Sequence, residues 1–266
     1  MIRVCSFCSS SCTPVATYFS RCDSCGHGFR SYEGDPTEYH AIEYRKRFKR
    51  VSNEITDNGM ITPSFHRVRK SICKSRIKLL KGLLQPEFNC LDIGAGGGTF
   101  AKLLSKEVKN VDCTEVDPNV ASEIEKLGLK VSVGDFMTMS FDNKYDIVFA
   151  WHVAEHIPDI QAFVEKAMAI TTRYLVLEVP TNRKIKEYFD GHYHHFSLTS
   201  FRLCLKDPRI LWVREGIQSP SLLGVAIPDG NRDYETGDES SQRVYGKRVH
   251  PQNLWVTTGS GKLPSV

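Results

Sequence analysis

Short apolar runs alternate with amphipathic stretches through the middle of this chain. The runs predict strands at Asn89–Ile93, Val111–Val116, Leu129–Val133, Tyr145–Trp151 and Tyr174–Val179. The stretches between them predict helices at 99–107, 118–127 and 159–171, where apolar positions recur at helical spacing. Strands and helices that alternate at this spacing predict a doubly wound α/β domain, with a parallel sheet covered on both faces.

The flanking segments differ in composition and divide the chain. Residues 1–31 are rich in cysteine and short of aliphatic residues, and 32–65 predict a linker with a helix near 37–52. A basic amphipathic helix at 66–84 opens the main domain, which we expect to end at 228 after a helix at 197–206 and strands at 210–217 and 222–227. The tail, 229–266, is polar and weakly patterned, which predicts mostly irregular structure.

Five of the nine cysteines lie in the first 25 residues. Cys5 and Cys8 form one Cys-x2-Cys pair, and Cys22 and Cys25 form another. Two such pairs supply the four thiolates of a tetrahedral zinc ion, and four protein ligands leave no open position for catalysis. The spacing therefore predicts a small zinc ribbon with structural Zn²⁺. Cys12 is either a fifth thiol beside the site or an alternative ligand. The competing interpretation is that the four cysteines are reduced free thiols.

A glycine-rich turn follows the strand at Asn89–Ile93 and precedes a helix. Its glycines include Gly94, Gly96 and Gly98, and Asp92 lies at the end of the strand. Such a turn lets a ligand approach the backbone closely. A dinucleotide fingerprint would place a glycine at position 99, where this chain has Thr99.

The run Leu-Asp-Ile-Gly-Ala-Gly-Gly-Gly resembles motif I of class I S-adenosylmethionine-dependent methyltransferases, which have a Rossmann-like sheet. The resemblance covers roughly residues 70–228 and implies S-adenosylmethionine as cofactor. It implies that Asp92 helps to hold the methionine end and that Glu115 accepts the ribose hydroxyls. It also implies that Asp135 accepts from the adenine amino group, with Phe136 against the ring. Asp117 is expected to cap the helix that Pro118 begins.

Five of the nine histidines follow the strands at Tyr145–Trp151 and Tyr174–Val179. The carboxyl ends of parallel strands share one edge of a sheet, where ligands bind. Methyl transfer to a hydroxyl or carbon acid needs a base, and histidine serves near neutral pH. We therefore predict His156 or His195 as the catalytic base, with Glu155 orienting it. In the alternative interpretation, these residues only cap elements or fill a loop.

Charge and composition restrict the choice of partners. The net charge is +4, and residues 45–81 contain twelve Lys or Arg but only two acids. This segment is either the solvated face of helices or a surface for an anionic partner, such as a nucleotide, a phosphorylated metabolite or RNA. No membrane span and no secretory segment are evident, which predicts a cytoplasmic protein.

The combined motifs resemble sugar and small-molecule methyltransferases related to the nucleotide-sugar C-methyltransferases. This implies a small, anionic or sugar-containing substrate, including nucleotide-linked ones, although those enzymes usually carry a further large C-terminal domain. His152, Glu155, His156 and His195 also have some likeness to the metal-binding group of RNA 3′-terminal ribose methyltransferases, which expect Glu at position 152. An RNA methyltransferase is therefore the alternative. A cofactor-binding subunit without catalysis is a third hypothesis.

Overall fold

The computed structural model describes residues 3–16, 19–30, 63–181, 192–206, 210–216 and 221–228. Seven strands form the large central sheet, in the order β11-β12-β9-β8-β5-β6-β7. They are β5 (Asn89–Ile93), β6 (Asn110–Glu115), β7 (Lys130–Val133), β8 (Tyr145–Trp151), β9 (Thr171–Pro180), β11 (Ile210–Glu215) and β12 (Ser221–Ala226). The five strands from β5 to β9 run parallel, whereas β12 is antiparallel to both of its neighbours. The predicted doubly wound α/β fold is thus confirmed.

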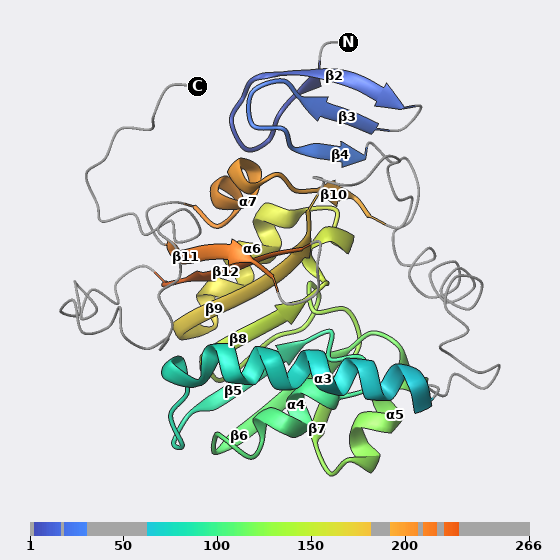
Figure 1. Cartoon of the computed structure of the whole chain (residues 1–266), viewed down its shortest axis with the longest axis vertical. Helices are drawn as coiled ribbons and strands as arrows, with labels where there is room; N and C mark the ends of the chain where they lie inside the picture. Colours follow the sequence, from blue (N-terminus) through green and yellow to red (C-terminus); the bar gives the residue numbers. More distant parts are fainter. Residues whose placement is uncertain are drawn as a thin grey trace.

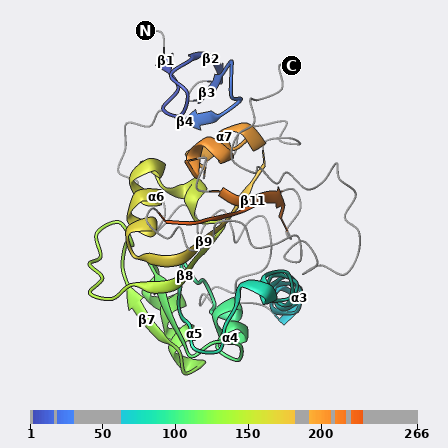
Figure 2. The same cartoon turned by 90° about the vertical axis from the view of Figure 1, so that its left-hand side faces the viewer.

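Two layers of helices cover the sheet, and Figure 2 shows α3 and α6 on opposite faces. One layer contains α3 (Pro63–Leu80), the short η2 (Lys81–Leu83), α4 (Thr99–Leu104) and α5 (Pro118–Lys126). The other contains α6 (Ile160–Ala169) and α7 (Leu198–Cys204). The side chains of β8 alternate accordingly. Ile147 and Phe149 belong to the core under α3 and α4, and Val148 and Ala150 to the core under α6 and α7.

The cysteine-rich N-terminus forms a second, smaller sheet in the order β1-β2-β3-β4-β10. Its strands are β1 (Arg3–Val4), β2 (Ser11–Ala16), β3 (Phe19–Cys22), β4 (Gly28–Arg30) and β10 (His194–His195). The last strand comes from the large domain and pairs antiparallel with β4. Figure 1 shows β2, β3 and β4 in blue above α7 and β10 in orange next to β4, so that the N-terminal segment lies directly on the large domain.

Most predicted element boundaries lie within a few residues of the observed ones. The helix predicted at 66–84 begins earlier, at Pro63, and gives way to η2 at Lys81. Strand β9 extends beyond the predicted Tyr174–Val179 at both ends. The predicted helix near 37–52 and the tail 229–266 lie outside the described residues. None of the described helices is long and apolar enough to cross a lipid bilayer.

Candidate functional site

The glycine turn between β5 and α4 has backbone conformations that favour glycine. The φ angles of Gly94, Gly96 and Gly98 are 62°, 54° and 70°. A Cβ on Gly94 would lie 2.7 Å from Val153, directly after β8. A Cβ on Gly96 would lie 3.0 Å from Nη1 of Arg69 on α3. The turn is therefore bounded by the segment after β8 on one side and by α3 on the other.

Asp92, at the end of β5, is a buried acid with an unusual pKa. Its side chain is 1% exposed, and neither carboxylate oxygen has a hydrogen-bond partner among the described residues. Burial raises its pKa to about 8, against the opposing charges of Arg76 and Arg69. A carboxylate in this position fits a ligand that brings a positive charge or hydrogen-bond donors to the glycine turn.

Glu115 lies at the end of the neighbouring strand β6 and faces the same turn. Oε2 accepts the N–H of Gly96 at 2.9 Å, and Oε1 accepts the N–H of Asp117 at 3.1 Å. Burial raises its pKa, although these two backbone donors oppose the shift. Asp117 caps α5 by accepting the N–H of Asn119 at 2.9 Å, as predicted. Each oxygen of Glu115 keeps accepting capacity for a ligand hydroxyl.

Asp135 and Phe136 follow β7 and differ in exposure. Asp135 is exposed, and its Oδ1 accepts the N–H of Met137 at 2.9 Å. The ring of Phe136 is buried in the core, with centroid distances of 5.4 Å to Phe163 and 5.5 Å to Phe141. Contacts of these two residues with an adenine ring remain predictions.

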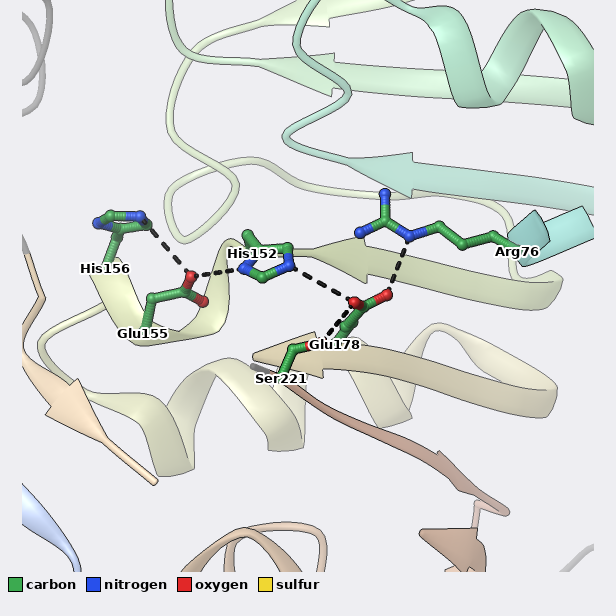
Figure 3. Close-up of polar contacts among 6 residues, drawn as sticks. All are labelled: Arg76, His152, Glu155, His156, Glu178 and Ser221. Carbon is green, nitrogen blue, oxygen red and sulfur yellow. Dashed lines mark hydrogen bonds and ion pairs between the residues drawn. The ribbon is translucent and has the colours of Figure 1, made fainter. Parts of the chain in front are cut away.

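A line of charged side chains begins where β8 ends (Figure 3). His152 has a φ of 56°, which is uncommon for a residue with a Cβ. Its ring lies between two carboxylates, with Nδ1 3.5 Å from Oε1 of Glu155 and Nε2 3.6 Å from Oε1 of Glu178. Glu155, in η3 (Ala154–His156), also lies 3.9 Å from Nε2 of His156. The predicted acid and its histidine are therefore neighbours.

Arg76 and Ser221 complete this line and were not predicted. Arg76 donates to Oε2 of Glu178 at 2.9 Å, and Ser221 donates to Oε1 at 2.8 Å. Arg76 also lies over the ring of Trp151, 4.3 Å from its centroid. The sequence did indicate that two charged residues are buried here. Glu178 interrupts the apolar run of β9, and Arg76 shares a helix face with Leu80.

The charges along this line compensate one another. Burial disfavours protonation of His152, but Glu155 and Glu178 outweigh it and raise its pKa to about 9. Burial alone would raise the pKa values of the two acids. Instead, His152 and His156 lower that of Glu155, and His152 and Arg76 lower that of Glu178, each to about 2. Two carboxylates thus face a guanidinium and an imidazolium.

The three histidines that follow β9, which are His192, His194 and His195, have different surroundings. The His192 ring lies edge-on to His156, with centroids 4.8 Å apart, and 5.6 Å from His195. His195 is 1% exposed and packs edge-on against Phe19 of the small sheet at 5.3 Å. His194 turns to His27 instead. The structure therefore brings the predicted residues Glu155, His156 and His195 to one edge and adds His192 to them.

Glu155, His156 and His192 offer ligand atoms that all lie within 4.8 Å of one another. This spacing would accommodate a cation, and the set overlaps the metal-binding likeness noted above in Glu155 and His156. The Glu155 carboxylate also lies 3.5 Å from Nδ1 of His152. The geometry of the three side chains is therefore compatible both with holding a cation and with acid–base chemistry.

The two cysteine pairs converge in the small sheet. Sulfur distances are 3.6 Å for Cys5 to Cys25 and 3.4 Å for Cys8 to Cys22, and all four sulfurs lie within 4.8 Å of one another. A tetrahedral zinc with bonds of about 2.3 Å separates its sulfurs by about 3.8 Å, so the four positions fit such an ion. Cys12 is not in this group and contacts the Ser10 carbonyl.

Comparison with known protein sequences agrees with this architecture. Residues 64–207, more than half of the chain, match the family described as "Methyltransferase domain". A ubiquinone biosynthesis O-methyltransferase from Pelagibacter ubique (strain HTCC1062) is 24% identical over 163 residues. That match covers 54% of this chain and 66% of the relative, just under two thirds of its length.

Two solved structures extend the similarity of fold. Magnesium protoporphyrin IX methyltransferase from Synechocystis PCC 6803, with bound S-adenosylhomocysteine, is 19% identical with a TM-score of 0.54, covering 72% of this chain and 97% of that one. Phosphoethanolamine N-methyltransferase 1 from Haemonchus contortus is 16% identical with a TM-score of 0.51, covering 75% of this chain and 53% of that one. The chain therefore belongs to the methyltransferase domain family and has the fold of a class I S-adenosylmethionine-dependent methyltransferase.

Proposed function

We propose that this protein transfers the methyl group of S-adenosylmethionine to a small, anionic or sugar-containing metabolite. The observation that carries the proposal is the adjacency of two sites. A buried Asp92 carboxylate and a glycine turn lie beside the segment that carries Glu155 and His156, since Gly94 abuts Val153. A methyl donor held at the first site has its transferable group close to acid–base residues at the second.

For the cofactor, we propose that the ammonium of its methionine end pairs with Asp92 and that its backbone passes Gly94, Gly96 and Gly98. Glu115 accepts the ribose hydroxyls, and Asp135 and Phe136 border the adenine. Arg69 is a further candidate, because its guanidinium lies over Gly96 and suits the cofactor carboxylate. Asp92 and Arg69 thus place one negative and one positive charge at the methionine end of the cofactor, which carries an ammonium and a carboxylate.

For the chemistry, we propose that His156 or His195 accepts a proton from the acceptor O–H or C–H bond. The electron pair of that bond then attacks the methyl carbon in line with the S–CH3 bond. The S–C bond breaks, its electrons stay on sulfur, and S-adenosylhomocysteine leaves. Glu155 stabilises the imidazolium that forms, a role for which its own low pKa suits it.

For the metal, we propose that Cys5, Cys8, Cys22 and Cys25 hold a structural Zn²⁺. Four thiolates complete a tetrahedral shell, so the ion contributes folding stability and takes no part in methyl transfer. The domain divisions at 31, 65 and 228 and the cytoplasmic location likewise remain our proposals.

A small-molecule acceptor is supported by the names of the relatives. One is named for ubiquinone biosynthesis, one for magnesium protoporphyrin IX and one for phosphoethanolamine. RNA is the alternative acceptor, supported by the basic composition of 45–81 and the histidine–glutamate cluster. The test is transfer of labelled methyl from S-adenosylmethionine into a host extract, fractionated by size with and without ribonuclease. Label in the small, ribonuclease-resistant fraction is the expected result. Label in a large, ribonuclease-sensitive fraction would replace the metabolite with RNA.

A further inference from the structure

We call Glu155, His156, His192 and His195 the acceptor side of the candidate site, and Asp92, the glycine turn and Glu115 its cofactor side. The N-terminal cysteine module (residues 3–30) is joined to the large domain at the acceptor side. Strand β10 of the large domain pairs with β4 of the module, in the register His194 to Phe29 and His195 to Gly28. The module therefore supplies the sheet partner for the two histidines that precede Phe196. Figure 1 shows this joint where β10 lies below β4, to the right of α7.

Two buried imidazoles form the centre of the joint. Nε2 of His27 lies 3.1 Å from Nδ1 of His194, and the rings stack with centroids 5.2 Å apart. On its other side, Nε2 of His194 lies 2.9 Å from the carbonyl of Ile157 and 3.1 Å from that of Pro158. Carbonyls only accept, so His194 carries its proton on Nε2, and its Nδ1 accepts from Nε2–H of His27. This directed chain links the second cysteine turn to the residues directly after His156.

Two further hydrogen bonds tie the cysteine turns to the same region. The Ser197 hydroxyl donates to the carbonyl of Cys25 at 2.5 Å and also caps α7. Gln161 of α6 donates to the carbonyl of Ser6, between Cys5 and Cys8, at 2.8 Å. Both cysteine turns are therefore attached directly to helices that flank the acceptor side.

Tyr193 connects the module to Glu155 through the backbone. The N–H of Arg30, the last residue of β4, donates to the carbonyl of Tyr193 at 2.8 Å. The N–H of Tyr193 donates in turn to the carbonyl of Glu155 at 2.8 Å. Phe19 of the module also packs on the ring of His195. The module thus reaches the predicted base and its acidic partner.

We infer that the cysteine module, with its proposed zinc ion, is a positioning element of the acceptor site, with His27 and His194 as its positioning residues. This inference rests on the proposed methyl transfer. The module fixes the segments around Glu155 and His192–His195, and with them the histidines that face the acceptor. The hydrogen bonds of this joint end on residues 155–161 and 193–197, and none of them ends on Asp92, the glycine turn or Glu115. Loss of the joint should therefore disturb the acceptor side and leave the cofactor side intact.

The test compares His27→Ala and His27→Gln in the full, zinc-loaded chain. Glutamine retains an N–H donor toward His194, so it should rescue much of what alanine loses. Thr13→Ala is the matched control, because it removes only an exposed hydrogen bond within the module, to Asp23 at 2.8 Å. Three readouts are measured: hydrogen–deuterium exchange, S-adenosylhomocysteine affinity by calorimetry, and labelled methyl transfer into host extract.

In His27→Ala we expect amide exchange in 155–157 and 193–201 to accelerate by about tenfold or more, the effect of losing one buried hydrogen bond. Exchange in 89–98 and cofactor affinity should stay within about twofold of wild type, while methyl transfer falls by about tenfold to a hundredfold. Removing zinc from the wild-type chain with a chelator should accelerate exchange in the same two segments.

Two results would overturn the inference. One is unchanged exchange at 155–157 and 193–201 in both the alanine variant and the chelated protein. The other is a loss of cofactor affinity equal to the loss of transfer, which would indicate general unfolding. Because exchange is measured without an acceptor, failure of the proposed methyl transfer is recognised separately: wild type would then lack transfer while the exchange result still decides the joint.

Discussion

Arg76 and Glu178 lie 102 residues apart in the sequence, yet Nε of Arg76 is 2.9 Å from Oε2 of Glu178 and both side chains are buried. The contact joins α3, whose Arg69 lies beside Gly96 of the glycine turn, to β9, which is followed by Thr181 in a bridge to Phe196, next to His195. It also holds the acid that faces His152. One buried ion pair thus connects the elements that carry the proposed cofactor side with those that carry the proposed acceptor side.

Removing Arg76 should be costly. Arg76→Ala leaves Glu178 as a buried charge with less compensation, and the free energy of unfolding should fall by about 3–5 kcal/mol. Denaturant unfolding followed by circular dichroism measures this. Lys70→Ala is the control on the exposed face of the same helix and should change stability by less than about 0.5 kcal/mol. A loss below about 1 kcal/mol for Arg76→Ala would show that the pair is not strongly coupled.

Asp92 should make cofactor binding depend on pH. Its pKa is about 8 in the cofactor-free protein, and pairing with the cofactor ammonium requires the ionised form. Affinity should therefore fall as pH drops below 8, by up to about tenfold per pH unit, with release of a proton on binding. Calorimetry in buffers of different ionisation enthalpy measures both effects. Asp92→Asn should bind weakly and without this dependence; an identical pH profile in this variant would assign the proton to another group.

His152 should stabilise the fold in a defined pH window. Its folded pKa of about 9 lies above the ordinary value of 6.5, so its contribution is complete below 6.5 and is lost as pH rises through 9. At most, this loss amounts to about 3 kcal/mol. His152→Asn tolerates the positive φ but has no titrating ring. The stability difference between wild type and this variant should shrink between pH 6.5 and 9, and a constant difference would contradict the protonated state.

The cysteine quartet predicts a specific metal content. Cys5→Ser should reduce bound zinc well below one equivalent and lower thermal stability, because four thiolates complete the tetrahedral shell. Cys12→Ser is the matched control, since Cys12 lies outside the quartet, and it should retain full zinc. Elemental analysis of the purified variants decides. Equal zinc in both variants would remove the quartet as the binding site.

The two candidate bases can be separated by paired variants. His156→Ala and His195→Ala should each leave cofactor affinity unchanged, whereas only the variant lacking the base should lose about a hundredfold to ten-thousandfold in methyl transfer. Glu155→Gln should give a smaller loss and a shifted pH–rate profile, because the glutamine cannot stabilise an imidazolium. Full activity in both alanine variants would exclude both histidines as the base.

The sequence predicted well what depends on local pattern. Strands β5 and β8 have the predicted bounds, and Asp92, the glycine turn and Glu115 meet at one sheet edge because parallel strands share their carboxyl ends. The four cysteines converge because their spacing forms two tight turns. These features depend on short stretches of chain and on a single topological rule.

Other features depend on pairs that no local pattern specifies. The packing of α3 on the sheet decides whether Glu178 pairs with Arg76, with another basic residue or with a ligand. Strand β10 has two residues, too few for any periodicity, so its pairing with β4 could not be predicted. The same applies to His27 and His194, whose contact joins segments 167 residues apart.

Calorimetric titration of the purified chain with S-adenosylmethionine, in parallel with Glu115→Ala, tests the proposed cofactor site most directly. Glu115 accepts two backbone N–H groups at the turn, so Glu115→Gln, which keeps an accepting oxygen, controls for local structure. One S-adenosylmethionine should bind per chain, and Glu115→Ala should weaken binding by about tenfold to a hundredfold, with Glu115→Gln in between. Absence of binding to folded wild-type protein, or full affinity in the alanine variant, would contradict the proposed cofactor site.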